Sequence, residues 1–332
     1  MNKLRAGLVG LGAMGRHHAR VLRHLDGVEF IGVFDPAEDP EGHVDRIPVV
    51  ANLQDLMDLG MDYCVVAAPT ETHVDVASEL AGRGVAVLVE KPVADSYTSG
   101  QELLQRVRKA GVVSGVGHIE RFNIATTEMR RRIEDGELGD VYQIATRRQG
   151  PYPVRIRDTG VVFDLATHDL HLASWIGASE YETVSAQTTH RSGRTHEDAV
   201  VINGRLQNGI IVSHIVNWLT PFKERTVMAV GSRGAFVADT LTEDLTFIEN
   251  PLHPTDWDTL GHFRGVAEGN RIRYALAKRE PLVVEHEDFR DAVRTGGSAG
   301  VPLEEGLKVV RVAEAVLASA HDGGASKTLG SI

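Results

Sequence analysis

The first third of the sequence alternates short apolar runs with segments in which apolar residues recur every three or four positions. Unbroken apolar runs are typical of strands buried on both faces of a parallel sheet, and the longer spacing is typical of amphipathic helices. The alternation predicts right-handed βαβ units in a doubly wound parallel sheet. The expected strands are Ala6–Val9, Val28–Phe34, Tyr63–Ala68, Val85–Val89 and Val112–Gly117, and the expected helices are Met14–Leu25, His73–Arg83 and Ser96–Ala110.

The pattern changes after about residue 120. Strand-like runs then follow one another without intervening helices, which favours a largely antiparallel sheet. We therefore expect an α/β Rossmann domain over residues 1–120 and an α+β domain with a large, mostly antiparallel open sheet over 121–332. The second domain's expected helices are Ala125–Glu134, Phe163–Trp175 and Leu303–Ala320, and its expected strands are Val141–Arg148, Thr183–Thr189, Ala199–Leu206, Gly209–Trp218, Thr226–Val230 and Ala235–Ala238.

Charge and cysteine content narrow the class of protein. Lys and Arg number 35 against 46 Asp and Glu, a net charge of -11, so we expect no nucleic-acid or membrane partner. The single cysteine, Cys64, allows neither an internal disulfide nor a cysteine-based zinc site, which suits a reducing compartment. The first residues reach a glycine turn too early for a signal peptide, and no apolar run approaches about 18 residues. We expect a cytoplasmic protein.

A glycine-rich turn follows the first expected strand. Gly10-Leu-Gly12-Ala13-Met14-Gly15 has the spacing in which one glycine permits the tight turn, one lets backbone approach a pyrophosphate, and one allows helix-to-strand contact. Asp35, at the end of the second strand, would accept hydrogen bonds from the ribose hydroxyls and repel a 2′-phosphate. These positions predict NAD rather than NADP. The alternative is a structural glycine turn followed by a surface aspartate.

Further cofactor contacts are expected where the next strands end, because ligands of open α/β sheets bind at the carboxyl ends of strands. The candidates are Ala68, Pro69, Thr70, His73, Glu90 and Lys91. Thr70 and His73 could equally cap the following helix. Lys91 would face the nicotinamide and exchange a proton with a substrate oxygen. The alternative for Lys91 is a surface lysine in a turn.

A second candidate cluster lies on the expected helix Phe163–Trp175. Asp164, His168 and His171 are spaced four and three apart, so an α-helix would place them on one face. A histidine held by an aspartate suits removal of a hydroxyl proton at neutral pH. The residues alone leave three interpretations open: an acid–base site, a metal site, or a polar face without a chemical role.

Taken together, these motifs resemble the glucose–fructose oxidoreductase/inositol dehydrogenase (Gfo/Idh/MocA) family over nearly the whole chain. The resemblance implies that Lys91, Asp164 and His168 form the catalytic group and that no metal is needed. Two positions depart from the family pattern. Ala166 stands where glycine is frequent, and His171 stands where aspartate is usual, so the sugar hydroxyls recognised there are left open.

Three further stretches are similar to family members that act on nucleotide-linked amino sugars, especially UDP-N-acetylglucosamine 3-dehydrogenases. They are Gly117–Asn123, Arg147–Asp158 and Asn217–Arg225. Arginines at 121, 147, 148, 155 and 157 could bind a diphosphate through charge-assisted hydrogen bonds, or could form salt bridges on the sheet. The expected substrate-binding residues are Lys91, His118, Glu120, Arg121, Asn123, Arg155, Arg157, His168 and His171.

The predicted activity is NAD-dependent oxidation of a secondary hydroxyl, at C3 of a UDP-linked N-acetylhexosamine. In this prediction the amine of Lys91 and the imidazole of His168 converge on one hydroxyl. One alternative is a dehydrogenase of inositol or a free monosaccharide, and another is a non-catalytic NAD-binding sensor. We also expect a homodimer or homotetramer through the second sheet, with Val200, Ile202, Ile211 and Ile215 on the open face. The alternative is that these residues pack against the chain's own helices.

Overall fold

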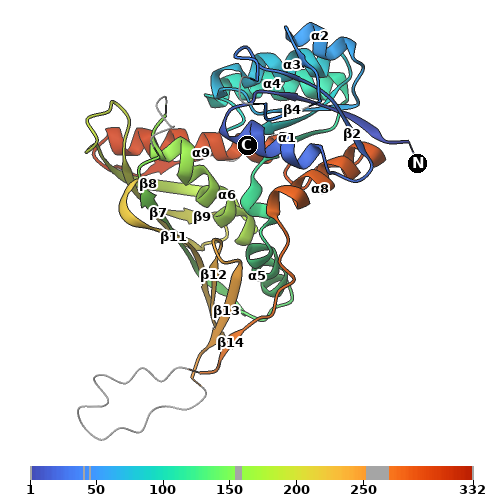
Figure 1. Ribbon diagram of the computed structural model, residues 1–332. Helices are drawn as coiled ribbons and strands as arrows, with labels where there is room; N and C mark the ends of the chain where they lie inside the picture. The colour runs from blue at the N-terminus through green and yellow to red at the C-terminus, as the bar shows by residue number, and fades with distance from the viewer. Residues whose placement is uncertain (1, 40–41, 45, 154–158, 252–268, 331–332) are drawn as a thin grey trace, which may run out of the picture. The chain divides into compact units, whose positions relative to one another are not determined.

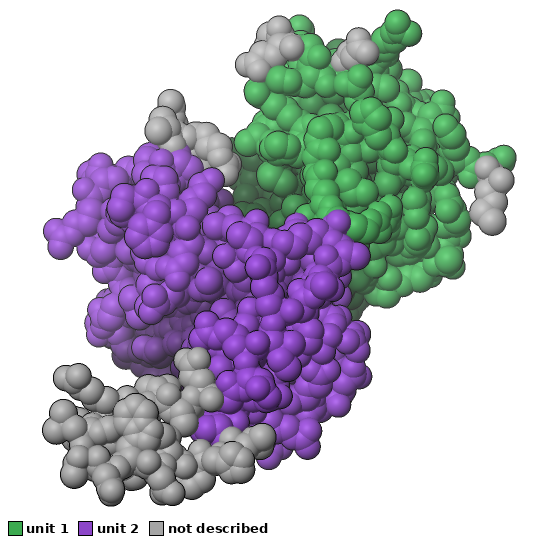
Figure 2. Space-filling model, turned by 60° about the horizontal axis from the view of Figure 1, so that its bottom comes forward, with its two compact units in different colours: residues 1–122, 279–314 green, residues 123–278, 315–332 purple. Residues whose placement is uncertain are grey.

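The protein forms two compact units in the computed structural model, which describes residues 2–39, 42–44, 46–153, 159–251 and 269–330. Unit 1 comprises residues 1–122 and 279–314, and unit 2 comprises residues 123–278 and 315–332. Figure 2 distinguishes the two units by colour. The sequence had suggested a single boundary at residue 120. Instead, residues 279–314 return to the N-terminal unit and pack there.

Unit 1 contains a six-stranded parallel sheet in the order β3-β2-β1-β4-β5-β6. This is the Rossmann order: strands are added outward from β1 to β3, and then on the other side of β1 from β4 to β6. The change of side between β1 and β4 leaves a crevice at the carboxyl ends of the strands. Every residue of β4 and β5 is buried, as the unbroken apolar runs predicted. The strands are β1 (Leu4–Val9), β2 (Val28–Phe34), β3 (Val49–Val50), β4 (Tyr63–Val66), β5 (Ala86–Glu90) and β6 (Ser114–Gly117).

The helices of unit 1 begin and end at recognisable signals. Ser96 caps α4 by accepting a hydrogen bond from the Ser99 amide, and Gly111 ends it in the left-handed conformation. Pro281 begins α8, and Gly296 ends it in the same way as Gly111. The helices are α1 (Ala13–Leu22), α2 (Leu53–Asp58), α3 (His73–Gly82), α4 (Tyr97–Ala110), α8 (Pro281–Thr295) and the first part of α9 (Leu303–His321), with 3-10 turns η1 (Thr70–Thr72) and η2 (Ile119–Phe122).

Unit 2 is built on a nine-stranded sheet in the order β14-β13-β12-β11-β7-β10-β9-β8-β15 (Figure 1). All of its strand pairs are antiparallel except β7 with β10, which confirms the mostly antiparallel expectation. The strands are β7 (Val141–Pro151), β8 (Tyr181–Thr189), β9 (Ala199–Leu206), β10 (Ile211–Asn217), β11 (Leu219–Gly231), β12 (Gly234–Asp239), β13 (Asp244–Glu249), β14 (Arg271–Arg273) and β15 (Lys327–Thr328).

Helices cover one face of this sheet. Helix α5 (Ile124–Glu134) packs against β12 and β13, and α6 (Thr167–Ile176) packs against β7 and α5. The opposite face carries exposed apolar side chains, but not all those expected. Val200 and Ile202 are 1% and 0% exposed and face the helices, whereas their neighbour Val201 is 46% exposed. Side chains alternate between the two faces along a strand. The expected face is therefore wrong for Val200 and for every other residue of β9.

Candidate functional site

The glycine turn between β1 and α1 is built around two close backbone approaches and one open position. Gly10 has φ +94°, and a Cβ there would lie 2.5 Å from the carbonyl oxygen of Ala67. A Cβ at Gly15 would lie 2.0 Å from the carbonyl oxygen of Gly10. Around Gly12, by contrast, a Cβ meets no atom within 4 Å, and no side chain caps α1. An open turn at an uncapped helix N-terminus fits a pyrophosphate.

Asp35 follows β2 and holds the glycine turn. Its carboxylate accepts hydrogen bonds from the backbone N–H of Leu11 at 2.6 Å and of Ala37 at 2.7 Å. The Leu11 hydrogen bond links the carboxylate to the glycine turn. The oxygens have further lone pairs, so the carboxylate can also accept hydrogen bonds from ribose hydroxyls. The residues present therefore fit NAD.

His73 ties together two loops at the carboxyl ends of neighbouring strands. Its side chain is buried, with Nε2 2.8 Å from the carbonyl oxygen of Ala68 and Nδ1 3.0 Å from that of Pro92. Burial lowers the pKa of His73, against the opposing effect of these hydrogen bonds. A neutral ring carries one N–H and donates to only one of the two carbonyls. His73 therefore contacts both the loop after β4, which includes Pro69 and Thr70, and the loop after β5.

The loop after β5 contains Glu90, Lys91 and Pro92, with a cis peptide bond between the last two. Glu90 is buried, while Lys91 is partly exposed. One carboxylate oxygen of Glu90 accepts a hydrogen bond from the Lys91 backbone N–H at 3.0 Å. The other lies 2.8 Å from Nε2 of His18, a residue of α1 that the sequence analysis did not single out. His18 is the one polar residue among the buried positions of α1, which was the available signal.

The segment after β6 contains four predicted substrate-binding residues. His118 is buried, and Glu120 and Arg121 belong to the 3-10 turn η2. Arg121 donates a hydrogen bond to Glu305 at 2.6 Å within unit 1. Asn123 begins unit 2 and caps α5: its side chain accepts from the Ala125 N–H and donates to the Thr240 carbonyl, both at 3.0 Å.

Asp164 lies in a π-helical turn, Val162–Ala166, that leads directly into α6. The sequence predicted one continuous α-helix here. Asp164 and His168 are partly exposed, whereas His171 is completely buried. The three side chains therefore differ in their access to solvent. Single π-turns inside helices are frequent at functional sites.

Two buried anchors hold this segment. The sequence analysis did not single out Glu197, and it named Arg148 only as one of the arginine cluster. The carboxylate of Glu197 accepts a hydrogen bond from the Val162 N–H at 2.9 Å. The guanidinium of Arg148, on β7, donates from Nε to the Asp169 carboxylate at 2.9 Å, and both side chains are at most 4% exposed. Asp169 directly follows His168. The position of the candidate histidine thus depends on an ion pair with the sheet.

The predicted arginine cluster is divided in the structure. Arg121 and Arg148 form the ion pairs described above, and Arg147 is exposed on the sheet, 3.8 Å from Glu224. These three match the salt-bridge alternative. Arg155 and Arg157 lie outside the described residues.

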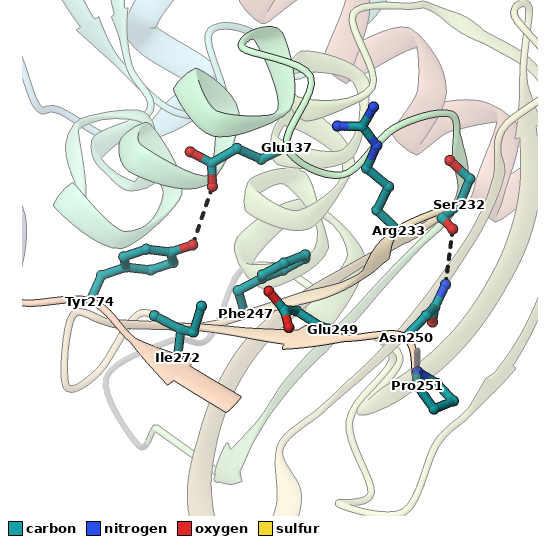
Figure 3. A pocket seen from close by; sticks show the side chains of 9 residues that line it. All are labelled: Glu137, Ser232, Arg233, Phe247, Glu249, Asn250, Pro251, Ile272 and Tyr274. Carbon is teal, nitrogen blue, oxygen red and sulfur yellow. Dashed lines mark hydrogen bonds between the residues drawn. The ribbon is translucent and has the colours of Figure 1, made fainter. Parts of the chain in front are cut away.

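A hollow of about 590 Å³ in unit 2 contains none of the candidate catalytic residues. Figure 3 shows its lining, with Tyr274 donating a hydrogen bond to Glu137 and Asn250 donating one to the Ser232 carbonyl. Among the described residues, no three His, Cys, Asp or Glu side chains are grouped so that they could hold a metal ion. None of the described helices is both long and apolar enough to cross a bilayer.

Comparisons with known proteins identify the family. The model of the oxidoreductase family with an NAD-binding Rossmann fold matches residues 4–118, and the model of the GFO/IDH/MocA C-terminal domain matches residues 126–237. The chain belongs to the Gfo/Idh/MocA family. It is an NAD-dependent oxidoreductase, which confirms the expected family, cofactor and class of reaction.

The relatives have more than one named activity. The scyllo-inositol 2-dehydrogenase (NAD(+)) of Bacillus subtilis is 30% identical over 55% of this chain and 57% of its own length. The UDP-N-acetylglucosamine 3-dehydrogenase of Acidithiobacillus ferrooxidans is 26% identical over 88% of this chain and 90% of its own. The solved structure of GnnA, a UDP-N-acetylglucosamine 3-dehydrogenase from A. ferrooxidans, has a TM-score of 0.86 at 23% identity and covers 97% of this chain and 99% of its own. At this identity the structural match establishes the fold alone.

Proposed function

We propose that this enzyme oxidises a secondary hydroxyl of a sugar, and that its substrate is a UDP-linked N-acetylhexosamine oxidised at C3. The observation that carries the substrate proposal is the similarity to a UDP-N-acetylglucosamine 3-dehydrogenase along nearly the whole chain. The likeness of Gly117–Asn123 and Asn217–Arg225 to members acting on nucleotide-linked amino sugars supports it. Arg155 and Arg157 are the proposed diphosphate ligands, because the structure gives Arg121 and Arg148 carboxylate partners.

We propose that the glycine turn, with Ala13 and Met14, and Asp35 hold the cofactor, together with Ala68, Thr70 and Lys91. These residues would hold NAD, which would supply the acceptor for the hydride of the sugar carbon. Lys91 and His168 serve the hydroxyl at that carbon: one takes its proton and the other donates a hydrogen bond to its oxygen. Asp164 keeps His168 in the orientation that this transfer requires. His118, Glu120, Asn123 and His171 are proposed to contribute to recognition of the sugar.

A turnover screen tests the function directly. The enzyme is incubated with NAD and, separately, UDP-N-acetylglucosamine, UDP-N-acetylgalactosamine, scyllo-inositol and myo-inositol, and NADH formation is followed by absorbance. We expect turnover with a UDP-sugar, and a loss of about 10²- to 10⁴-fold in Lys91→Met and in His168→Asn. Full activity of Lys91→Met would remove the lysine from the mechanism.

An inositol is the second candidate substrate, because several relatives are inositol dehydrogenases, one of them 26% identical over 96% of this chain. A neutral cyclitol needs no cationic ligand. Replacing Arg155 and Arg157 with Gln should therefore raise KM strongly for a UDP-sugar and leave KM for an inositol unchanged. Turnover of an inositol alone would reject the nucleotide-sugar proposal and retain the dehydrogenase.

We also propose that the enzyme is a homodimer or homotetramer that uses the open face of the unit 2 sheet. Val201, Ile211 and Ile215 on that face are 46%, 49% and 37% exposed. Val201 and Ile215 are directly opposite each other on β9 and β10. Contiguous exposed apolar side chains on a sheet are typical of an interface between subunits.

A further inference from the structure

Three buried polar side chains in unit 1 form a hydrogen-bonded chain next to the loop that contains Lys91. It joins His18 on α1, Glu90 at the end of β5 and His286 on α8, and these are 0%, 6% and 1% exposed. His18 Nε2 lies 2.8 Å from a Glu90 carboxylate oxygen, and His18 Nδ1 lies 2.8 Å from His286 Nε2. Three separate elements therefore supply one continuous hydrogen-bonded chain, which ends at the residue before Lys91.

The carboxylate fixes the direction of the first hydrogen bond in this chain. An ionised carboxylate only accepts, so His18 donates to Glu90 from Nε2. The protonation of the two rings decides which of His18 Nδ1 and His286 Nε2 donates to the other. The second oxygen of Glu90 accepts from the backbone N–H of Lys91. Burial and the neighbouring His18 lower the pKa of His286 well below its ordinary value.

The surroundings keep the negative charge at Glu90. Burial alone would raise the pKa of Glu90, but the hydrogen bond and electrostatic effect of His18, followed by the positive charge of Lys91, lower it below its ordinary value. Gly117 on the neighbouring strand leaves room for the carboxylate, because a Cβ there would lie 3.1 Å from it. A buried negative charge is costly without hydrogen-bond donors. The donors to Glu90 are the His18 imidazole and the Lys91 backbone N–H.

We propose that His18 and His286 are positioning residues that act through Glu90 on Lys91. They orient the carboxylate, which binds the Lys91 backbone and holds a negative charge beside the lysine amine. The inference rests on the proposed role of Lys91 in proton transfer. A network needed only for folding would change stability alone. A positioning network changes kcat while leaving cofactor affinity intact, because misplacing a reacting group by about 1 Å can cost a hundredfold.

The test compares His18→Leu, which removes the donor, with His18→Gln, which retains an N–H near Glu90. His17→Leu is the matched control, because His17 is the preceding residue of α1 and is exposed. Turnover is measured with NAD and UDP-N-acetylglucosamine, or with scyllo-inositol if the screen selects it. NAD affinity is measured by fluorescence titration, and the folded fraction by circular dichroism.

We expect His18→Leu to lower kcat about tenfold to a hundredfold, with KM and the NAD Kd within about twofold of the parent. His18→Gln should recover most of the loss, and His17→Leu should match the parent. An unchanged kcat in folded His18→Leu would overturn the proposal, as would a loss that parallels weaker NAD binding.

Two further variants complete the design. If His18→Leu does not fold, Gly117→Ala displaces the Glu90 carboxyl without removing a buried side chain, and the same criteria apply to it. Lys91→Met separates this inference from the proposed function. An inactive Lys91→Met beside a fully active His18→Leu refutes only the positioning role, whereas a fully active Lys91→Met refutes the proposed role of Lys91 on which it rests.

Discussion

Two carboxyl groups, Glu90 and Glu285, are buried in the same part of unit 1 and interact electrostatically. Glu90 has hydrogen-bond donors from His18 and Lys91. Among the described residues, neither carboxyl oxygen of Glu285 has a hydrogen-bond partner. Burial and the charge of Glu90 raise the pKa of Glu285 well above its ordinary value. We therefore expect the pair to carry a single negative charge at neutral pH, located on Glu90, with the proton on Glu285.

Glu285→Gln tests this charge assignment through the pH dependence of stability. The folded state binds the Glu285 proton more tightly than the unfolded chain does. Its stabilising contribution is complete below about pH 4.3 and is lost as the pH rises toward the folded pKa. Glutamine mimics the neutral acid without this loss. We expect the unfolding free energy of Glu285→Gln to exceed the parent's by an amount that grows as the pH rises from about 4.3 toward the folded pKa, by up to about 1.4 kcal/mol per pH unit.

Urea unfolding at several pH values provides the measurement. Glu287→Gln is the control, because Glu287 lies on the same helix, is partly exposed and is paired with Arg279. Its stability should parallel the parent's across the range. Parallel curves for Glu285→Gln as well would mean that Glu285 is ionised in the folded protein.

At the scale of single residues, the sequence predicted what local motifs encode and missed what the fold brings together. The glycines from Gly10 to Gly15 occupy the turn that their spacing predicted. His18 and His286 are 268 positions apart, and nothing in either local sequence indicates the other. Arg121 shows the same difficulty: its positive charge suggested a phosphate ligand, while its partner Glu305 is 184 positions away.

At the scale of elements, α6 and its π-turn depend on the Arg148–Asp169 ion pair. Removing one member of a buried pair leaves an uncompensated charge and costs about 3–5 kcal/mol. Arg148→Met should therefore destabilise the protein by about this amount, and Arg148→Met with Asp169→Leu should recover much of the loss. The helix that carries Asp164 and His168 would also shift, so kcat should fall in the single variant.

Arg147→Met is the matched control for this pair. Arg147 precedes Arg148 on β7 but is 59% exposed, and its carboxylate partner Glu224 is 3.8 Å away. Exposed pairs of this kind contribute about 0–1 kcal/mol. Denaturant unfolding followed by circular dichroism compares the variants. Equal effects of Arg147→Met and Arg148→Met would show that the buried ion pair does not anchor the helix.

Element prediction succeeded where the hydrophobic pattern was strong. Strands Val28–Phe34 and Ala199–Leu206 have the predicted bounds, because apolar residues predominate in both. Helix α8 was missed because its buried face includes the polar residues Glu285 and His286. The π-turn was missed because an i, i+4 spacing of polar residues gives no sign of an extra residue in the turn.

At the scale of the whole molecule, the chain order does not match the division into units. Residues 279–314 follow the strands of unit 2 in sequence but belong to unit 1. Their apolar residues contribute to its core, where Phe289 stacks edge-on against Tyr63 of β4. No composition change marks this return, so a boundary drawn from the sequence assigned the segment to the second domain. Such long-range packing depends on the complete fold rather than on local pattern.

Association of several copies of the chain is a property of the whole molecule, and we predict that it uses the open face of the unit 2 sheet. In a twofold-symmetric interface each substitution occurs in both copies, so a charge placed there is buried twice. We expect the parent to sediment as a dimer or tetramer. Ile215→Glu should weaken association by at least about a thousandfold, equivalent to about 4 kcal/mol, because each unpaired buried charge costs several kcal/mol. Leu241→Glu, at a residue 50% exposed in the turn after β12, should leave the assembly unchanged. Analytical ultracentrifugation over a range of concentrations measures all three proteins, and a monomeric parent at high concentration would refute the proposed interface.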